Sequence, residues 1–211
     1  DGDDKPCESF DSQERSVRGS LISPDENANR KSTEDVGVSS IRSGSYQKSL
    51  EAYLKSLESK MHSSNWNETS IAATHSNIGS IFAELGNYEE ALKSYTKSLE
   101  LYEKAYGENH PKIASIYNNM GISYRYQGKL NQAIDSYKKA LEIKAKIYGN
   151  DSINIASTYI NLGVILEEKG KYDEALDYQY KAIRIYKESV GEDNLEMAAA
   201  YSNLGSIYKE Q

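Results

Sequence analysis

The sequence predicts an all-α fold, a right-handed solenoid of antiparallel helix pairs. The first observation is a fixed period of 42 residues, because Gly79, Gly121, Gly163 and Gly205 each lie one period apart. The second is that each period contains two apolar patterns at helical spacing, each followed by a glycine. The third is that one such pair cannot bury both of its apolar faces alone, so neighbouring pairs must stack.

The period at residues 67–110 shows how the two helices are specified. Apolar residues recur from about 71 to 85, and Gly86 ends this first helix. The second helix runs from about 88 to 106 and ends at Gly107. Gly79 lies inside the first helix, where glycine costs roughly 1 kcal/mol relative to alanine. Its recurrence in register predicts close contact with the second helix, whose facing position is alanine each time (Ala91, Ala133, Ala175).

The first 66 residues follow the period least. Residues 1–29 are rich in Ser, Asp, Glu and Asn, with Phe10 as their one aromatic residue, which predicts a disordered acidic tail. Residues 30–66 predict a degenerate first repeat with a second helix from Tyr46 to about 62. Its first helix, 30–43, is expected to be frayed or disordered, because Ser40 and Ser43 replace packing residues.

The rest of the chain divides at the period. Complete repeats are expected at 67–110, 111–152 and 153–193, and a partial repeat with its first helix alone at 194–211. The uncovered last helix is expected to expose Leu204, Ile207 and Tyr208 in part and to favour weak self-association. The chain opens without Met and stops within a helix pair, so a fragment or processed piece is expected.

Several features of the repeat together resemble a known family. They are glycine at the eighth position of the first helix, a Gly-x-Tyr or Gly-x-Leu turn, and Ala-x-x-x-Tyr on the second helix. An aromatic residue or Leu follows the helix glycine by three positions (Phe82, Tyr124, Leu166, Tyr208). The pattern resembles the tetratricopeptide repeat, in the 42-residue form of kinesin light chains and nephrocystin-like proteins. The resemblance covers about 67–211 and implies a protein-interaction fold.

Composition excludes several classes of function. The net charge of −7 and a pI near 5.1 argue against nucleic acid as a partner. No apolar run approaches the length of a membrane span. Three histidines at unrelated repeat positions, and no phosphate-binding loop, predict neither a metal or other cofactor nor an enzyme. The single Cys7 and the absence of a signal peptide favour a cytoplasmic protein.

The candidate binding residues begin with one asparagine per repeat. These asparagines, which we call the asparagine ladder, are Asn77, Asn119, Asn161 and Asn203. In the family that the chain resembles, an asparagine here commonly reaches into the concave groove and bonds the backbone of an extended peptide. A primary amide suits this task because it offers both donors and an acceptor. The alternative is that each amide caps a helix or bonds a neighbouring helix.

Residues that vary between repeats at adjacent register positions are expected to add selectivity for side chains. They are Asn118, Arg125, Tyr126, Glu84, Glu167 and Glu168. The acidic members, with Glu210, outnumber Arg125 and Lys209, so the groove is expected to favour a segment that carries Lys or Arg.

The sequence therefore predicts a non-catalytic protein–protein interaction scaffold that binds an extended peptide. A cargo adaptor like the kinesin light chains is one form of it. A regulatory or sensor repeat domain of a larger signalling enzyme is the alternative, and a purely structural spacer is a third interpretation.

Overall fold

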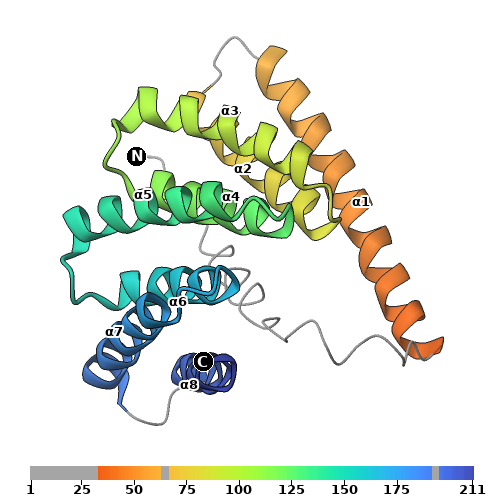
Figure 1. The fold of residues 1–211 in the computed structure, drawn as a ribbon. Coiled ribbons are helices and arrows are strands. Elements are labelled where there is room, and N and C mark those ends of the chain that lie inside the picture. Colours follow the sequence, from red (N-terminus) through yellow and green to blue (C-terminus); the bar gives the residue numbers. More distant parts are fainter. Residues whose placement is uncertain (1–32, 63–66, 192–194) are drawn as a thin grey trace. The chain divides into compact units, whose positions relative to one another are not determined.

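The computed structural model describes residues 33–62, 67–191 and 195–211 (Figure 1). These residues form eight helices and no strand. The helices are α1 (Thr33–His62), α2 (Glu68–Glu84), α3 (Tyr88–Tyr106), α4 (Pro111–Tyr126), α5 (Leu130–Tyr148), α6 (Ile153–Glu168), α7 (Tyr172–Val190) and α8 (Leu195–Glu210). The predicted tail, 1–29, lies outside the described residues. The chain divides into two units between Ser39 and Ser40, and the packing below concerns the second unit.

Three antiparallel helix pairs, α2–α3, α4–α5 and α6–α7, make up most of the second unit. Each tight turn has the same backbone hydrogen bonds, of the kind called a Schellman motif. In the first pair, Asn87 N donates to Phe82 O at 2.8 Å and Gly86 N donates to Ala83 O at 3.0 Å. Gly86 has a φ of 76°, in the left-handed region where a side chain is disfavoured. The turns that the sequence predicts are present.

The glycines within the first helices leave room for large side chains of the second helices. A Cβ added to Gly79 would lie 2.7 Å from the Tyr95 ring, and one added to Gly121 would lie 2.7 Å from the Tyr137 ring. Both tyrosines are buried. Burial raises the pKa of Tyr95 to about 12, and its hydroxyl donates to Ser80 Oγ at 3.2 Å. The close approach that the sequence predicts is therefore made by a tyrosine ring packed against glycine.

The third pair departs from this pattern at a position that the sequence reading did not single out. Gln179 takes the place of Tyr95 and Tyr137 and lies against Gly163. Its side chain is fully buried, and its Nε2 donates to Ile160 O at 3.3 Å. Its Oε1 has no hydrogen-bond partner among the described residues. The α6–α7 pair therefore has a polar core position where the other two have an aromatic ring.

Neighbouring pairs stack through the second helix of one and the first helix of the next, α3 on α4, α5 on α6 and α7 on α8. The α5–α6 step includes a hydrogen bond from Lys144 Nζ to Thr158 Oγ1 at 3.1 Å. Two periods earlier, Lys60 Nζ of α1 donates to Thr74 Oγ1 of α2 at 2.8 Å. The end of α1 therefore contacts α2 as a second helix contacts the next first helix. The predicted all-α solenoid of helix pairs is confirmed.

Two expectations about the ends differ from the structure. Helix α1 continues through Gly44 without a turn, so 33–43 extends this helix instead of forming a separate one. In α8, the expectation that Leu204 and Ile207 are exposed was wrong, because both are buried against the preceding pair. Tyr208 alone of the three is exposed.

A membrane-spanning segment was not expected. In the described part of the chain, no helix combines the length and the apolar character that crossing a bilayer requires.

Candidate functional site

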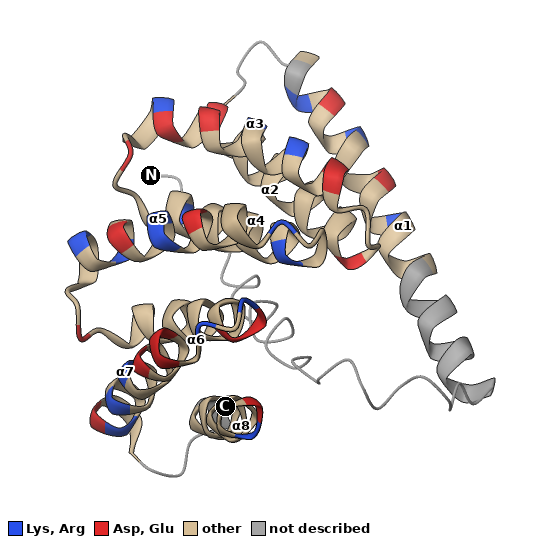
Figure 2. Cartoon of the chain, in the orientation of Figure 1, with Lys and Arg blue, Asp and Glu red and all other residues tan. Residues whose placement is uncertain are grey.

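The candidate site lies on the first helices of the pairs, α2, α4, α6 and α8, which we call the A-helices. The second helices, α3, α5 and α7 with residues 46–62 of α1, are the B-helices. Charged residues of the A-helices stand only near the helix ends (Figure 2). The middle turns carry the asparagine ladder. We call the ladder, together with Asn118, Glu84, Arg125, Tyr126, Glu167 and Glu168, the A-helix face.

The asparagine ladder is partly exposed at every step, but its amides differ in their contacts. Asn161 Nδ2 donates to Asn118 Oδ1 at 3.3 Å, which joins α6 to α4. The amides of Asn77 and Asn119 make no side-chain hydrogen bond to another described residue. The Nδ2 of Asn203 is buried and has no partner within the described chain. A helix-to-helix bond, the alternative that the sequence allowed, therefore occurs at one step.

Arg125 and Glu168 form an ion pair between the same two helices. Arg125 Nε lies 2.7 Å from Glu168 Oε1, and a second guanidinium nitrogen contacts the same oxygen. Burial lowers the pKa of Arg125, but the hydrogen bond and charge of Glu168 outweigh it and raise the pKa overall. The charge of Glu168 is thus largely balanced within the protein, which sequence register alone did not indicate.

The remaining acidic residues of the A-helix face accept hydrogen bonds from hydroxyls. Tyr46 donates to Glu84 Oε2 at 3.4 Å, and Ser206 donates to Glu167. Among the described residues, no Lys or Arg forms an ion pair with either carboxylate. Tyr126 is exposed and stacks on Tyr88 with ring centroids 5.2 Å apart. The structure therefore links the predicted residues between repeats, and within the described chain two carboxylates have no ion-pair partner.

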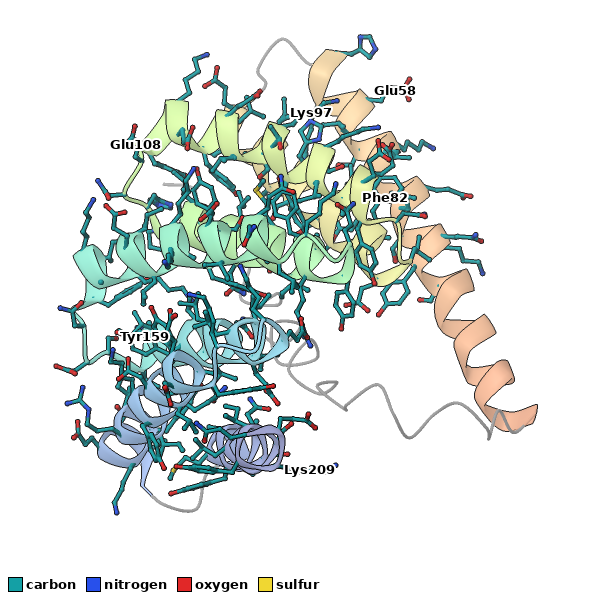
Figure 3. The ribbon with its side chains drawn as sticks, viewed as in Figure 1. Glu58, Phe82, Lys97, Glu108, Tyr159 and Lys209 are labelled. Atoms are coloured by element: carbon teal, nitrogen blue, oxygen red, sulfur yellow. The ribbon has the colours of Figure 1, made fainter. Side chains whose placement is uncertain are left out.

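A second recurring contact was missed in the sequence, although the 42-residue period could have revealed it. Lys139 Nζ of α5 lies 5.1 Å from the centroid of the Tyr117 ring on α4. One period on, Lys181 of α7 lies near the Tyr178 ring, which packs against Tyr159 of α6. Figure 3 labels Tyr159, and also Lys97, the equivalent lysine of α3. Lys139 and Lys181 lie over rings that connect the two helices of a pair, whereas the position equivalent to Tyr117 in the α2–α3 pair is His75.

Metal binding has no support in the described residues, where no group of three His, Cys, Asp or Glu side chains is placed to hold an ion. The A-helix face offers amide donors and acceptors, one ion pair and uncompensated carboxylates. This chemistry suits reversible binding of a polar chain.

The comparison with known families decides what kind of protein this is. The tetratricopeptide repeat model matches residues 70–146 and 154–211. The chain belongs to the tetratricopeptide repeat family. No protein of curated function matches the sequence.

Solved structures share the fold. BtubC (BKLC) from P. vanneervenii is 24% identical, with a TM-score of 0.72 over 80% of this chain and 67% of that one. A candidate kinesin light chain of Podosopora anserina with nearly identical TPR-like repeats is 15% identical, with a TM-score of 0.66 over 82% and 83%. A point variant of that protein gives a TM-score of 0.68. The likeness shows the fold of stacked helix pairs that the 42-residue period predicted.

Proposed function

We propose that this tetratricopeptide repeat protein is a scaffold whose A-helix face binds an extended segment of a partner protein, with a preference for Lys or Arg. Repeats of this family serve protein–protein interaction. The observation that carries the finer proposal is the pair of ladder amides, on Asn77 and Asn119, that are partly exposed and have no side-chain partner in the described chain.

The ladder would supply binding that is independent of side chains. A primary amide can donate to a peptide carbonyl and accept from a peptide N–H at once. Each such bond contributes about 0.5–1.5 kcal/mol net, so several are needed. Asn161 offers a further one, because its bond to Asn118 at 3.3 Å is long and can be exchanged for a peptide.

The carboxylates would supply the charge preference. Glu84 and Glu167 have no ion pair among the described residues, whereas Glu168 is held by Arg125. A negative field at the A-helix face raises the local concentration of a positively charged segment and the rate at which that segment associates.

The proposal is tested by selecting a random displayed peptide library on the purified protein and measuring the selected peptides by fluorescence anisotropy. The double variant Asn77→Ala with Asn119→Ala is expected to weaken all selected peptides by a similar factor, about tenfold or more. The control is Gln132→Ala on the exposed surface of α5, which should change nothing.

The outcomes separate the two parts of the proposal. Enrichment of acidic peptides that still depend on the asparagines would contradict the charge preference and leave the ladder standing. Failure to enrich any peptide, or equal binding by the double variant, would overturn the binding role of the A-helix face.

A further inference from the structure

Helix α8 leaves open a surface that is closed in every complete helix pair. Ala198 is exposed, whereas its equivalents in α2, α4 and α6 are fully buried (Ala72, Ala114, Ala156). A Cβ added to Gly205 would meet nothing within 4 Å, unlike one at the three equivalent glycines. Tyr201 and Tyr208 beside it are 53% and 54% exposed. This surface, which we call the α8 acceptor surface, is where a B-helix packs in the other pairs.

Helix α1 leaves open the complementary surface. Tyr53 is partly exposed, whereas its equivalents Tyr95 and Tyr137 are buried. Ser49 and Ser56 are also partly exposed, whereas every equivalent residue of α3, α5 and α7 is fully buried. We call Ser49, Tyr53, Lys55 and Ser56 the α1 donor surface. It is the side of a B-helix that contacts its own A-helix.

The two open helices are close copies of two helices that pair with each other. Residues of α1 that are identical to their equivalents in α3 are Tyr46, Leu50, Tyr53, Lys55, Ser56, Leu57 and Glu58. Residues of α8 that are identical to their equivalents in α2 are Ala198, Ala199, Ser202, Asn203, Gly205, Ser206, Ile207 and Glu210. Since α2 and α3 form a helix pair, α8 and α1 carry the side chains for the same pairing.

We propose that the α1 donor surface of one molecule docks on the α8 acceptor surface of a second copy and completes a helix pair. The occupant follows from continuity with the A-helix to B-helix interface that recurs within the chain. The interface is heterologous, since each copy contributes a different surface, and it joins molecules head to tail.

The equivalent positions of the helix pairs within the chain predict three contacts across this interface. Tyr53 of one copy packs against Gly205 of the next, as Tyr95 packs against Gly79. Ser56 Oγ donates to Ala198 O, as Ser98 Oγ donates to Ala72 O at 2.6 Å. Lys55 lies over the Tyr201 ring, as Lys139 lies over the Tyr117 ring. These contacts bury the apolar side chains that the isolated molecule exposes.

The test is sedimentation velocity of the 211-residue chain from low to high micromolar concentration. The wild-type mass is expected to rise with concentration. Gly205→Leu blocks the acceptor surface, and Ser56→Arg blocks the donor surface. Each variant alone is expected to sediment as a monomer. An equimolar mixture is expected to form a dimer and nothing larger, because one intact donor meets one intact acceptor.

Other outcomes overturn the proposal. A wild-type chain that stays monomeric at every concentration contradicts it. So does a Ser56→Arg variant that assembles like the wild type, since that pattern belongs to a symmetric contact between two copies of α8. Far-UV circular dichroism checks that both variants fold. Lys55→Glu, at an exposed position, is a second donor variant if Ser56→Arg unfolds, and is expected to weaken assembly about tenfold. The result does not depend on peptide binding by the A-helix face.

Discussion

Individual glycines of the repeat have different roles despite identical register. Gly121 lies against the buried Tyr137 ring, whereas Gly205 faces open space in the isolated molecule. Equivalent positions therefore differ in whether they tolerate a side chain, and the difference depends on which residue packs against the glycine.

Substitution of these two glycines by leucine should separate folding from assembly. Gly121→Leu is expected to lower the free energy of unfolding by about 1–3 kcal/mol or to prevent folding, because it overpacks the α4–α5 contact. Gly205→Leu is expected to leave it unchanged or raise it by up to about 1 kcal/mol, since leucine favours helix more than glycine does. Urea denaturation at low micromolar concentration measures both. Equal losses for the two variants would contradict the packing described here.

His110 gives the chain a titratable helix cap. Its Nδ1 accepts from Lys112 N at 3.2 Å at the start of α4, and its ring stacks on Tyr106 with centroids 4.1 Å apart. Burial and the charge of Lys112 lower the pKa of His110 from 6.5. Only the neutral ring can accept at Nδ1, so protonation removes the cap.

The expected pH dependence follows from this lowered pKa. Between the folded and unfolded pKa values the unfolded chain binds more protons, so the contribution of His110 is present above about pH 6.5 and is lost as pH falls below it. His110→Ser should keep the cap and remove this part of the pH dependence, because Ser152 at the equivalent position caps α6. Denaturant titrations at neutral pH and at about pH 5 measure the difference. Identical pH slopes for variant and wild type would refute the role of His110. His75, whose pKa is also lowered, by burial and then by Lys97, remains in both proteins.

At the scale of helices, the steps between pairs alternate in chemistry. Lysine contacts threonine from α1 to α2 and from α5 to α6, through Lys60–Thr74 and Lys144–Thr158. At the α3–α4 step between them, the same positions hold Tyr102 and Ile116, both buried. The side-chain contacts between pairs therefore repeat every second pair, which is twice the 42-residue period of the sequence.

This alternation can be tested by exchanging one step for the other. Thr158→Ile alone is expected to lower the free energy of unfolding by about 1 kcal/mol, because Lys144 Nζ loses the hydroxyl that accepts its hydrogen bond. Adding Lys144→Tyr recreates the pair of the α3–α4 step and should recover most of that loss. A double-mutant cycle by urea denaturation gives the coupling. Strictly additive effects would show that the two positions do not form a unit.

The sequence predicted the helix pairs well because their determinants are local. Helix period, turn glycines and the close approach of the second helix to the glycine inside the first all follow the 42-residue register, and the structure has each of them, with Gln179 in place of tyrosine in the third pair. The exposure of Leu204 and Ile207 in α8 was predicted wrongly, because apolar spacing does not say which neighbour covers a side chain. Leu204 faces the preceding pair, whereas Gly205 faces the side where a B-helix would lie.

The contacts within the candidate site could be predicted less well from the sequence. The Arg125–Glu168 pair joins positions that differ by one residue more than the period, so comparison of equivalent positions does not reveal it. Likewise, the bond between Asn161 and Asn118 uses a ladder residue and a neighbour outside the ladder. Register locates equivalent residues, but contacts between repeats depend on how far one pair is rotated against the next.

At the scale of the whole molecule, carboxylates differ in whether a lysine or arginine lies beside them. The chain has a net charge of −7. The B-helices carry many compensated charges, including ion pairs of Lys93 with Glu89 and Glu90 and of Lys146 with Glu142. Such exposed pairs contribute little to stability. Glu84 and Glu167, by contrast, have no pairing cation among the described residues, so they can contribute to the field that a partner meets.

Reversing these two charges tests the charge preference without disturbing the internal ion pair. Glu84→Lys with Glu167→Lys should exchange the order of affinity between matched peptides that differ only in Lys or Glu. The effect should shrink as salt rises, because exposed charges are screened over about 8 Å at physiological ionic strength. Arg125→Gln is the contrasting variant, since it frees Glu168 and should strengthen the preference for the Lys peptide. Fluorescence anisotropy at two salt concentrations measures both. An unchanged order in the double variant would mean that the backbone contacts of the asparagine ladder, and not the field of the A-helix face, determine which segment binds.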